Sequence, residues 1–357
     1  MGMLLRDWEP RMTTPARGHR LRAYVLFVVA VIYFFLARQL AIHGAQGLIA
    51  EQLSPLSPLV EQGMLVFLLL LGYAGFGFWF NRQLQPIRDQ GLPLRVGWTG
   101  EAGLGLAVGW AIALVCVLPL VVAGGIAIVL NLQLSAWGWF VADAAFFAVA
   151  ALAEEIAFRG YGFQRFAEAV GPLGASLGFA AYYAIVQAIA PNSSHASVAV
   201  SVALSLVLAT AYLRTKALWV SWGINFGWKA SRALLFGLAV SGDTSHLHVV
   251  QGDPMGPLWL TGGGYYGLDG TWLAFIVLCA ALPVVYRVTS ELNYRYNTPV
   301  IVPAGIPVDL DAAARKQHEA AMGPAPAVPS LVQIGPAAEL PEPLTKSVGA
   351  DADSGAP

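Results

Sequence analysis

Long runs of apolar residues, separated by short polar segments, make up most of the chain before about residue 290. A helix needs roughly 20 apolar residues to cross the hydrocarbon core, and backbone groups in lipid must be paired within helices or closed barrels. Runs of this length predict an all-α fold, a polytopic transmembrane helical bundle of about eight spans. The predicted spans are residues 24–42, 64–81, 103–130, 138–157, 172–190, 197–213, 217–240 and 271–287.

The basic residues gather in one set of predicted loops. Five arginines precede the first span, and the second loop carries Arg82, Arg88 and Arg95. Short cytoplasmic loops are enriched in arginine and lysine, whereas the opposite loops here are mainly acidic, with residues such as Glu51 and Asp243. With an even number of spans, both termini are predicted to be cytoplasmic.

Composition supports a membrane body and excludes one class of partner. Hydrophobic residues account for 57% of the chain and charged residues for 11%, and the net charge is -1; soluble domains carry roughly a quarter charged residues. No basic surface is available for nucleic acid, so no nucleic-acid partner is expected. Cys116 and Cys279 lie in separate apolar runs and are interpreted as buried small residues rather than as a disulfide or metal cluster.

These features divide the chain into four predicted parts. Residues 1–23 form a basic cytoplasmic segment, and residues 24–95 form two transmembrane helices with a cytoplasmic loop. Residues 96–290 form the main transmembrane domain. Residues 300–357 are rich in proline and alanine and are predicted to be a disordered cytoplasmic tail, with a short helix near residues 311–322.

Two adjacent carboxylates stand near the end of the fourth predicted span. Glu154 and Glu155 follow an apolar stretch, and Arg159 lies four residues after Glu155, on the same helical face. An ionised carboxylate in hydrocarbon is costly, so such acids usually face the bundle interior and mark a site. One interpretation is a structural ion pair at the membrane edge; the two adjacent acids followed by arginine and glycine favour a functional site.

This segment, Glu-Glu-x-x-x-Arg-Gly at residues 154–160, resembles the first motif of the CPBP family of CAAX proteases and bacteriocin-processing proteins. Residues 176–183 and 218–229 are similar to the second and third motifs, and residues 260–267 to a loop of bacterial members. The resemblance runs from about residue 95 to 287. It implies an intramembrane metalloendopeptidase in the bacterial cytoplasmic membrane, with Glu154 and Glu155 as general base and carbonyl-polarising or metal-binding groups and Arg159 orienting them.

Both motif histidines of that family are replaced here. The second motif, Phe-x-x-x-His, ends in Tyr183, and the third motif, His-x-x-x-Asn or Asp, reads Asn225 and Lys229. A phenol and an amide are much poorer ligands than imidazole for the zinc-like divalent metal that the resemblance implies. If the protein is active, Tyr183 and Asn225 are replacement polar groups at a metal site; if it is not, no metal is expected.

Lys229 adds a cation where ligands are missing. If the motif helices converge, Lys229 and Arg159 compensate Glu154 and Glu155 and leave a neutral polar cluster in the membrane. That hypothesis favours a catalytically inactive family member that binds membrane lipid or a membrane-associated or lipid-modified peptide, or acts as a scaffold. A third interpretation is a transporter in which the carboxylates carry protons or couple to a cation.

Three further features are singled out. Asp143 lies eleven residues before Glu154 on the same predicted face, where it either deepens the polar interior or sits at the outer interface. His246 and His248 are interpreted as ordinary loop surface rather than as a chelating pair. Close helix approach is predicted at two sets of glycines: Gly72, Gly75 and Gly77, and Gly103, Gly105 and Gly109.

Overall fold

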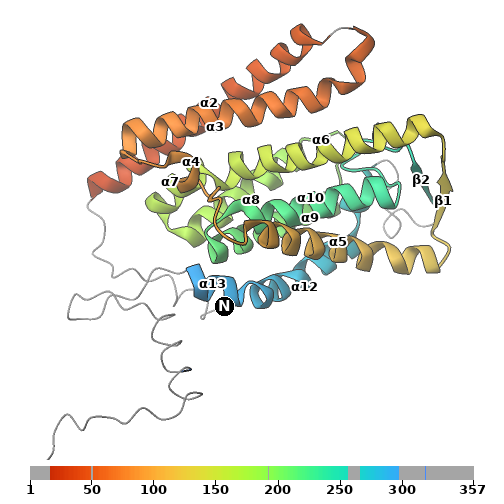
Figure 1. The fold of residues 1–357 in the computed structure, drawn as a ribbon. Helices are drawn as coiled ribbons and strands as arrows, with labels where there is room; N and C mark the ends of the chain where they lie inside the picture. Colours follow the sequence, from red (N-terminus) through yellow and green to blue (C-terminus); the bar gives the residue numbers. More distant parts are fainter. Residues whose placement is uncertain (1–16, 50, 192, 256–265, 297–317, 319–357) are drawn as a thin grey trace, which may run out of the picture. The chain divides into compact units, whose positions relative to one another are not determined.

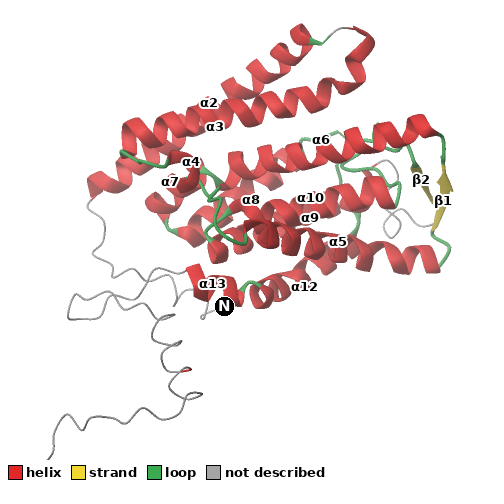
Figure 2. Ribbon diagram, in the orientation of Figure 1, coloured by secondary structure: helices red, strands yellow, loops and turns green. Residues whose placement is uncertain are grey.

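The computed structural model describes residues 17–49, 51–191, 193–255, 266–296 and 318, and this part of the chain is almost entirely helical (Figures 1 and 2). The longest helices are α2 (Arg17–Leu48), α3 (Ser57–Asn81), α5 (Trp98–Val122), α6 (Leu134–Arg159) and α9 (His195–Thr215). The shorter ones are α4 (Pro86–Asp89), α7 (Tyr161–Val170), α8 (Pro172–Ala188), α10 (Leu218–Ala230), α12 (Trp272–Val288) and α13 (Ser290–Tyr296). Single helical turns are η1 (Glu51–Leu56), η2 (Ser231–Leu235) and η4 (Leu268–Gly270), and the strands are β1 (Ile126–Leu130) and β2 (Val250–Pro254).

The predicted class, an all-α membrane helical protein, is confirmed. Among the described residues, five helical stretches are long and apolar enough to cross a membrane: α2, α3 with part of η1, α5, α6 continued by α7, and α9. The remaining predicted spans correspond to the shorter helices α8, α10 and α12. The count of eight spans and the cytoplasmic placement of the termini stay predictions.

The predicted span 103–130 is wrong at its end. Helix α5 stops at Val122, and Gly124 adopts φ +71°, a left-handed conformation that favours glycine. The β-branched stretch that follows forms β1, which pairs antiparallel with β2, Ile126 opposite Pro254 and Leu130 opposite Val250. An apolar run alone does not distinguish a helical end from a strand.

The predicted span 217–240 is also too long. Helix α10 ends at Ala230, the π-helical turn η2 follows, and the chain then turns back at Gly237, with φ +65°. Gly252 donates its backbone N–H to the Gly237 carbonyl at 2.8 Å. A Cβ on Gly237 would lie 2.5 Å from the Gly252 nitrogen, so the close approach of this turn to β2 requires glycine.

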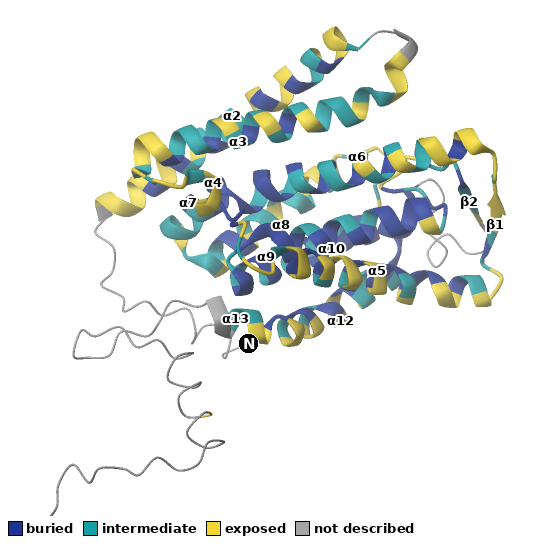
Figure 3. Cartoon of the chain, viewed as in Figure 1, coloured by how far each residue is buried: buried dark blue, intermediate teal, exposed yellow. Residues whose placement is uncertain are grey.

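Helix α10 occupies the centre of the bundle and crosses α5 at close range. In Figure 3 it is drawn mostly in the colour of buried residues. A Cβ on Gly105 would lie 2.2 Å from the Val220 carbonyl oxygen, and one on Gly223 would lie 2.3 Å from that of Ala102. The prediction of close approach is therefore confirmed at Gly105 and Gly109, because glycine is what lets these two backbones meet. It is wrong at Gly75 and Gly103, where an added Cβ would meet no described atom within 4 Å.

The outward faces are apolar. Large side chains such as Leu36, Phe67 and Val141 are more than half exposed, as expected for surfaces that contact lipid rather than water. Cys116 is buried as predicted, but Cys279 is exposed on α12, which corrects the expectation for it. The predicted tail and its helix near residues 311–322 lie outside the described residues, apart from His318.

Candidate functional site

The site begins at the last turns of α6. Glu155 is fully buried, and its Oε1 atom accepts a hydrogen bond from Nη1 of Arg159 at 3.0 Å. The pair is four residues apart, so the helix itself sets its geometry. Arg159 is also buried and donates from Nη2 to the Ser205 carbonyl on α9 at 3.4 Å. The guanidinium thereby ties the carboxylate end of α6 to α9.

Helix α10 supplies the partners of Glu154. The Lys229 ammonium forms an ion pair with Oε1 of Glu154. Nδ2 of Asn225, one turn earlier on α10, donates to Oε2 of Glu154 at 2.9 Å and to Oε1 of Glu155 at 3.2 Å. Both oxygens of Glu154 therefore accept hydrogen bonds from α10, and each glutamate has its own cation.

Tyr183 completes the group from α8. The Arg159 guanidinium carbon lies 5.6 Å from the centre of the Tyr183 ring, within the range of a cation–π contact. The Phe158 ring also packs against the Tyr183 ring, with centroids 4.9 Å apart. The structure therefore places all six predicted site residues, Glu154, Glu155, Arg159, Tyr183, Asn225 and Lys229, in one cluster where α6, α8 and α10 meet.

The donors of this cluster do not fit a zinc-like ion. Such ions take imidazole, thiolate or free carboxylate ligands, and within the described part of the chain no group of three or more histidine, cysteine or acidic side chains could hold a metal. Each oxygen of Glu154 is engaged, one of them by an ammonium. A cation already stands where the resemblance implies a metal.

A cavity of about 310 Å³ opens beside the cluster. Its lining includes Glu154, Tyr183, Asn225 and Lys229, together with side chains from α2 and α3. The site is therefore accessible from a hollow within the bundle, whereas Glu155 and Arg159 lie behind its wall.

A second ion pair lines the same cavity and was missed by the sequence analysis. Arg232 is fully buried and pairs through Nη1 with Oδ1 of Asp269 at 2.7 Å. The other oxygen of Asp269 accepts from the backbone N–H and hydroxyl of Ser241, at 3.2 and 3.1 Å. The signal in the sequence was that Arg232 follows Lys229 by three residues on the same helix, hence on the same face; nothing local points to Asp269.

Asp143 lies in a separate polar cluster, eleven residues before Glu154 on α6. Its Oδ1 contacts Nδ1 of His246 at 2.7 Å, and its Oδ2 contacts Nδ1 of His248 at 2.8 Å. The His246 ring stacks on Phe146 with centroids 4.4 Å apart and is 8% exposed. The interpretation of His246 as loop surface is therefore wrong; the two histidines anchor the loop after η2 to α6 at Asp143.

The charge state of His246 follows from this packing. Burial by itself lowers its pKa, but hydrogen bonds and charge from Asp143 and Asp243 outweigh that effect and raise the pKa of His246 to about 9. The same contact from His246 holds the pKa of Asp243 well below its usual range, against the opposing effect of burial. At neutral pH the histidine is therefore a cation paired with two carboxylates.

Comparison with protein families identifies the segment that carries the candidate site. Residues 135–231 match the family model described as type II CAAX prenyl endopeptidase Rce1-like. This segment is therefore similar to the Rce1-like family. The match runs from the start of α6 to the end of α10 and contains every residue of the Glu154–Lys229 cluster. The resemblance to CPBP proteins is thus confirmed over these residues.

Comparison with curated proteins and with solved structures identifies no similar protein. The Rce1-like segment covers less than half of the chain, so α2, α3 and α12 lie outside the matched region.

Proposed function

We propose that this integral membrane protein uses its Rce1-like segment to bind a ligand within the membrane and does not cleave peptide bonds. The observation that supports this proposal is the ion pair between the Lys229 ammonium and Glu154, in a cluster that carries no histidine. Each carboxylate of the motif has a cation of its own, so the cluster is electrically neutral.

Hydrolysis would ask more of these carboxylates than their partners allow. A general base must be free to accept a proton from the attacking water, and a metal would lower the pKa of that water. Glu154 accepts hydrogen bonds on both oxygens from Lys229 and Asn225. Glu155 is fully buried against Arg159. These contacts stabilise a neutral group of polar side chains beside the cavity instead of a reactive base.

A neutral group of polar side chains suits binding in a membrane. Unpaired charge is costly in a medium of low dielectric constant, whereas paired and hydrogen-bonded charge is tolerated. The expected partners are membrane lipid or a membrane-associated, lipid-modified peptide, and the expected location is the bacterial cytoplasmic membrane. The further proposal below narrows this choice.

The test compares metal content and peptide hydrolysis between the wild type and a variant that restores the family pattern. The restored variant is Tyr183→His/Asn225→His/Lys229→Asn, which returns both motif histidines and removes the ammonium. Each protein is purified at full length in detergent, incubated with zinc, desalted and assayed for bound metal. We expect stoichiometric zinc in the restored variant and none retained by the wild type.

The control is Glu154→Gln/Glu155→Gln made in both backgrounds. Loss of zinc from the restored variant on this change would place the metal at the carboxylates. Stoichiometric zinc in the wild type that disappears with the same change would overturn the proposal and return the protein to the metalloendopeptidase interpretation. Helical circular dichroism of every variant checks that the bundle is intact.

A further inference from the structure

The cavity beside the Glu154–Lys229 cluster carries an excess positive charge. Its charged lining residues, among those described, are Arg38, Glu154, Lys229, Arg232 and Asp269. Glu154 is paired with Lys229, and Asp269 with Arg232. No ion pair or hydrogen bond to the Arg38 side chain occurs within the described residues, so one cation of this cavity has no counterion among them.

Arg38 lies within the apolar helix α2 with its side chain exposed, and an unpaired guanidinium that faces lipid is costly. It belongs to α2, which is apolar enough to span a membrane. Nine residues of this helix lie between Arg38 and its last residue, Leu48. Charged side chains at such positions face a polar interior and pair with an anion. No described acidic side chain pairs with Arg38, so its exposed guanidinium is open to an anionic group from outside the chain.

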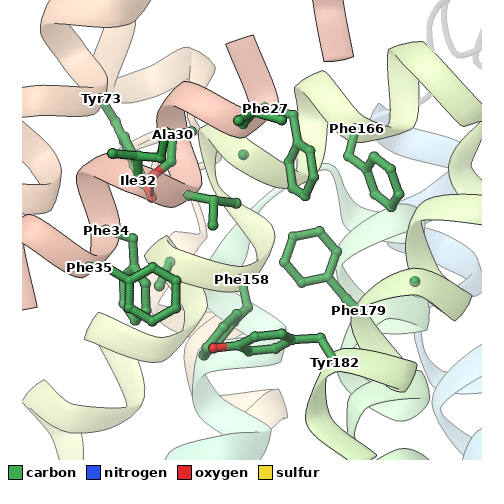
Figure 4. Close-up of a pocket in the computed structure, with 15 residues that line it drawn as sticks. Phe27, Ala30, Ile32, Phe34, Phe35, Tyr73, Phe158, Phe166, Phe179 and Tyr182 are labelled. Carbon is green, nitrogen blue, oxygen red and sulfur yellow. Dashed lines mark hydrogen bonds between the residues drawn. The ribbon is translucent and has the colours of Figure 1, made fainter. Parts of the chain in front are cut away.

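A second cavity, almost wholly apolar, adjoins the first. It has a volume of about 270 Å³ and is lined by residues of α2, α3, α6, α7 and α8. Figure 4 shows Phe27 and Phe34 gathered with Phe158, Phe179 and Tyr182 around this space. Phe34, Phe158 and Tyr182 line both cavities, so the two hollows share a wall at these rings.

Arg38 lines the first cavity together with Phe34 and Tyr182, which line both. On α2, Phe27, Val31 and Phe34 line the apolar cavity on the same face that carries Arg38 one turn further on. From Phe27 to Arg38 the helix rises about 16 Å. A ligand that lies along this face would therefore place an apolar chain against the phenylalanines and an acid group, directly at the end of that chain, against Arg38.

The apolar cavity opens sideways to the surroundings of the helices. Ile32 is 56% exposed and Phe35 is 46% exposed, and both belong to its lining. These exposed faces are the ones expected to contact lipid. An amphiphile dissolved in the membrane would thus reach the cavity without crossing water.

We propose that the paired cavities bind the anion of a long-chain fatty acid, with its carboxylate on Arg38 and its chain in the apolar cavity. A guanidinium and a carboxylate form a bidentate charge-assisted pair, and one carboxylate supplies the missing counterion. The apolar volume lies just below the roughly 300–1,000 Å³ typical of ligand pockets, which suits one chain rather than two. A fatty acid, unlike a lysophospholipid, has its charge directly on the chain end. This inference rests on the proposal that the site binds rather than hydrolyses.

The test measures binding of radiolabelled palmitate to the full-length protein in a non-ionic detergent at neutral pH. The wild type should bind one palmitate saturably, at least tenfold more tightly than hexadecanol, which has the same chain and no charge, and should not bind acetate. Equal binding of palmitate and hexadecanol would overturn the proposal. Tighter binding of lysophosphatidylglycerol than of palmitate would overturn the choice of a carboxylate. Neither comparison needs a variant.

Two substitutions then locate the ligand. Arg38→Gln should weaken palmitate binding at least tenfold while leaving hexadecanol unchanged, and Arg38→Lys should retain most of the affinity. Arg82→Gln, at the end of α3, removes an arginine outside the cavity lining and should have no effect. Unchanged palmitate affinity in folded Arg38→Gln protein would overturn the site. Absence of palmitate binding in a wild type that also retains no zinc would refute this inference and leave the proposed function standing.

Discussion

The Lys229–Glu154 ion pair gives the sharpest test of the charge-compensated cluster. Replacing Lys229 with methionine keeps most of the length of the side chain and removes its charge, so Asn225 is the remaining partner of Glu154 among the described residues. Replacing Glu154 with glutamine leaves an amide that still accepts from Asn225. The double variant removes both charges and should restore a neutral site.

The structure sets the expected size of the effect. Breaking a fully buried pair by removing one partner costs about 3–5 kcal/mol. The side chains here are 18% exposed for Lys229 and 33% for Glu154, so solvent in the cavity relieves part of that cost. We expect Lys229→Met to lower the free energy of unfolding by about 2 kcal/mol, and the double variant to fall short of the sum of the single effects by about 1–3 kcal/mol.

The assay is reversible unfolding of the full-length protein in mixed micelles, followed by circular dichroism as the fraction of denaturing detergent rises. Lys229→Arg, which keeps the charge, serves as the conservative control and should cost less than Lys229→Met. Single effects that add within about 0.5 kcal/mol would mean that the two groups do not interact. The reasoning about charge compensation would then be refuted.

Two further predictions concern packing and pH. Gly223→Ala should lower the free energy of unfolding by about 1–3 kcal/mol, because its Cβ would meet the Ala102 carbonyl oxygen. The control is Gly103→Ala, whose Cβ would have no atom within 4 Å. It should be neutral or slightly stabilising in the same unfolding assay. Burial opposes the charged form of His246, but its pairing with two aspartates raises its pKa to about 9, above the roughly 6.5 of an unfolded histidine. The stabilisation of the fold by this pairing is therefore complete below about pH 6.5 and is lost as the pH rises through about 9. The stability deficit of Asp143→Asn should accordingly shrink between pH 7 and pH 10, and a deficit independent of pH would contradict this assignment.

Local patterns in the sequence were enough for the helices and for one of the two ion pairs of the cluster. The repeat of a helix fixes which residues share a face, so Glu155 and Arg159 could be paired from their spacing alone. The length of the apolar runs determined the all-α membrane class. Gly105 and Gly109, four residues apart, indicated a close helix contact before any partner helix was known.

Helix ends were less predictable, because they depend on distant partners. The segment Ile126–Leu130 continues an apolar run and was assigned to a helix, but it forms β1 because β2, some 120 residues later, offers a strand to pair with. Hydrophobicity is the same in both states. Which one forms is decided by backbone hydrogen bonds to a segment that the local sequence does not reveal.

The chemical character of the site was decided by tertiary structure. The sequence established that Glu154, Asn225 and Lys229 are present and that the two motif histidines are absent. Only the packing of α10 on α6 determined that the ammonium and the amide both bind Glu154. Asp143 and His246 are likewise joined across 103 residues. Arg38 becomes a candidate ligand only when α2 is placed beside α6 and α8. Charges along a chain are a property of sequence, whereas which of them lack a counterion is a property of the folded molecule, because pairing requires proximity in space.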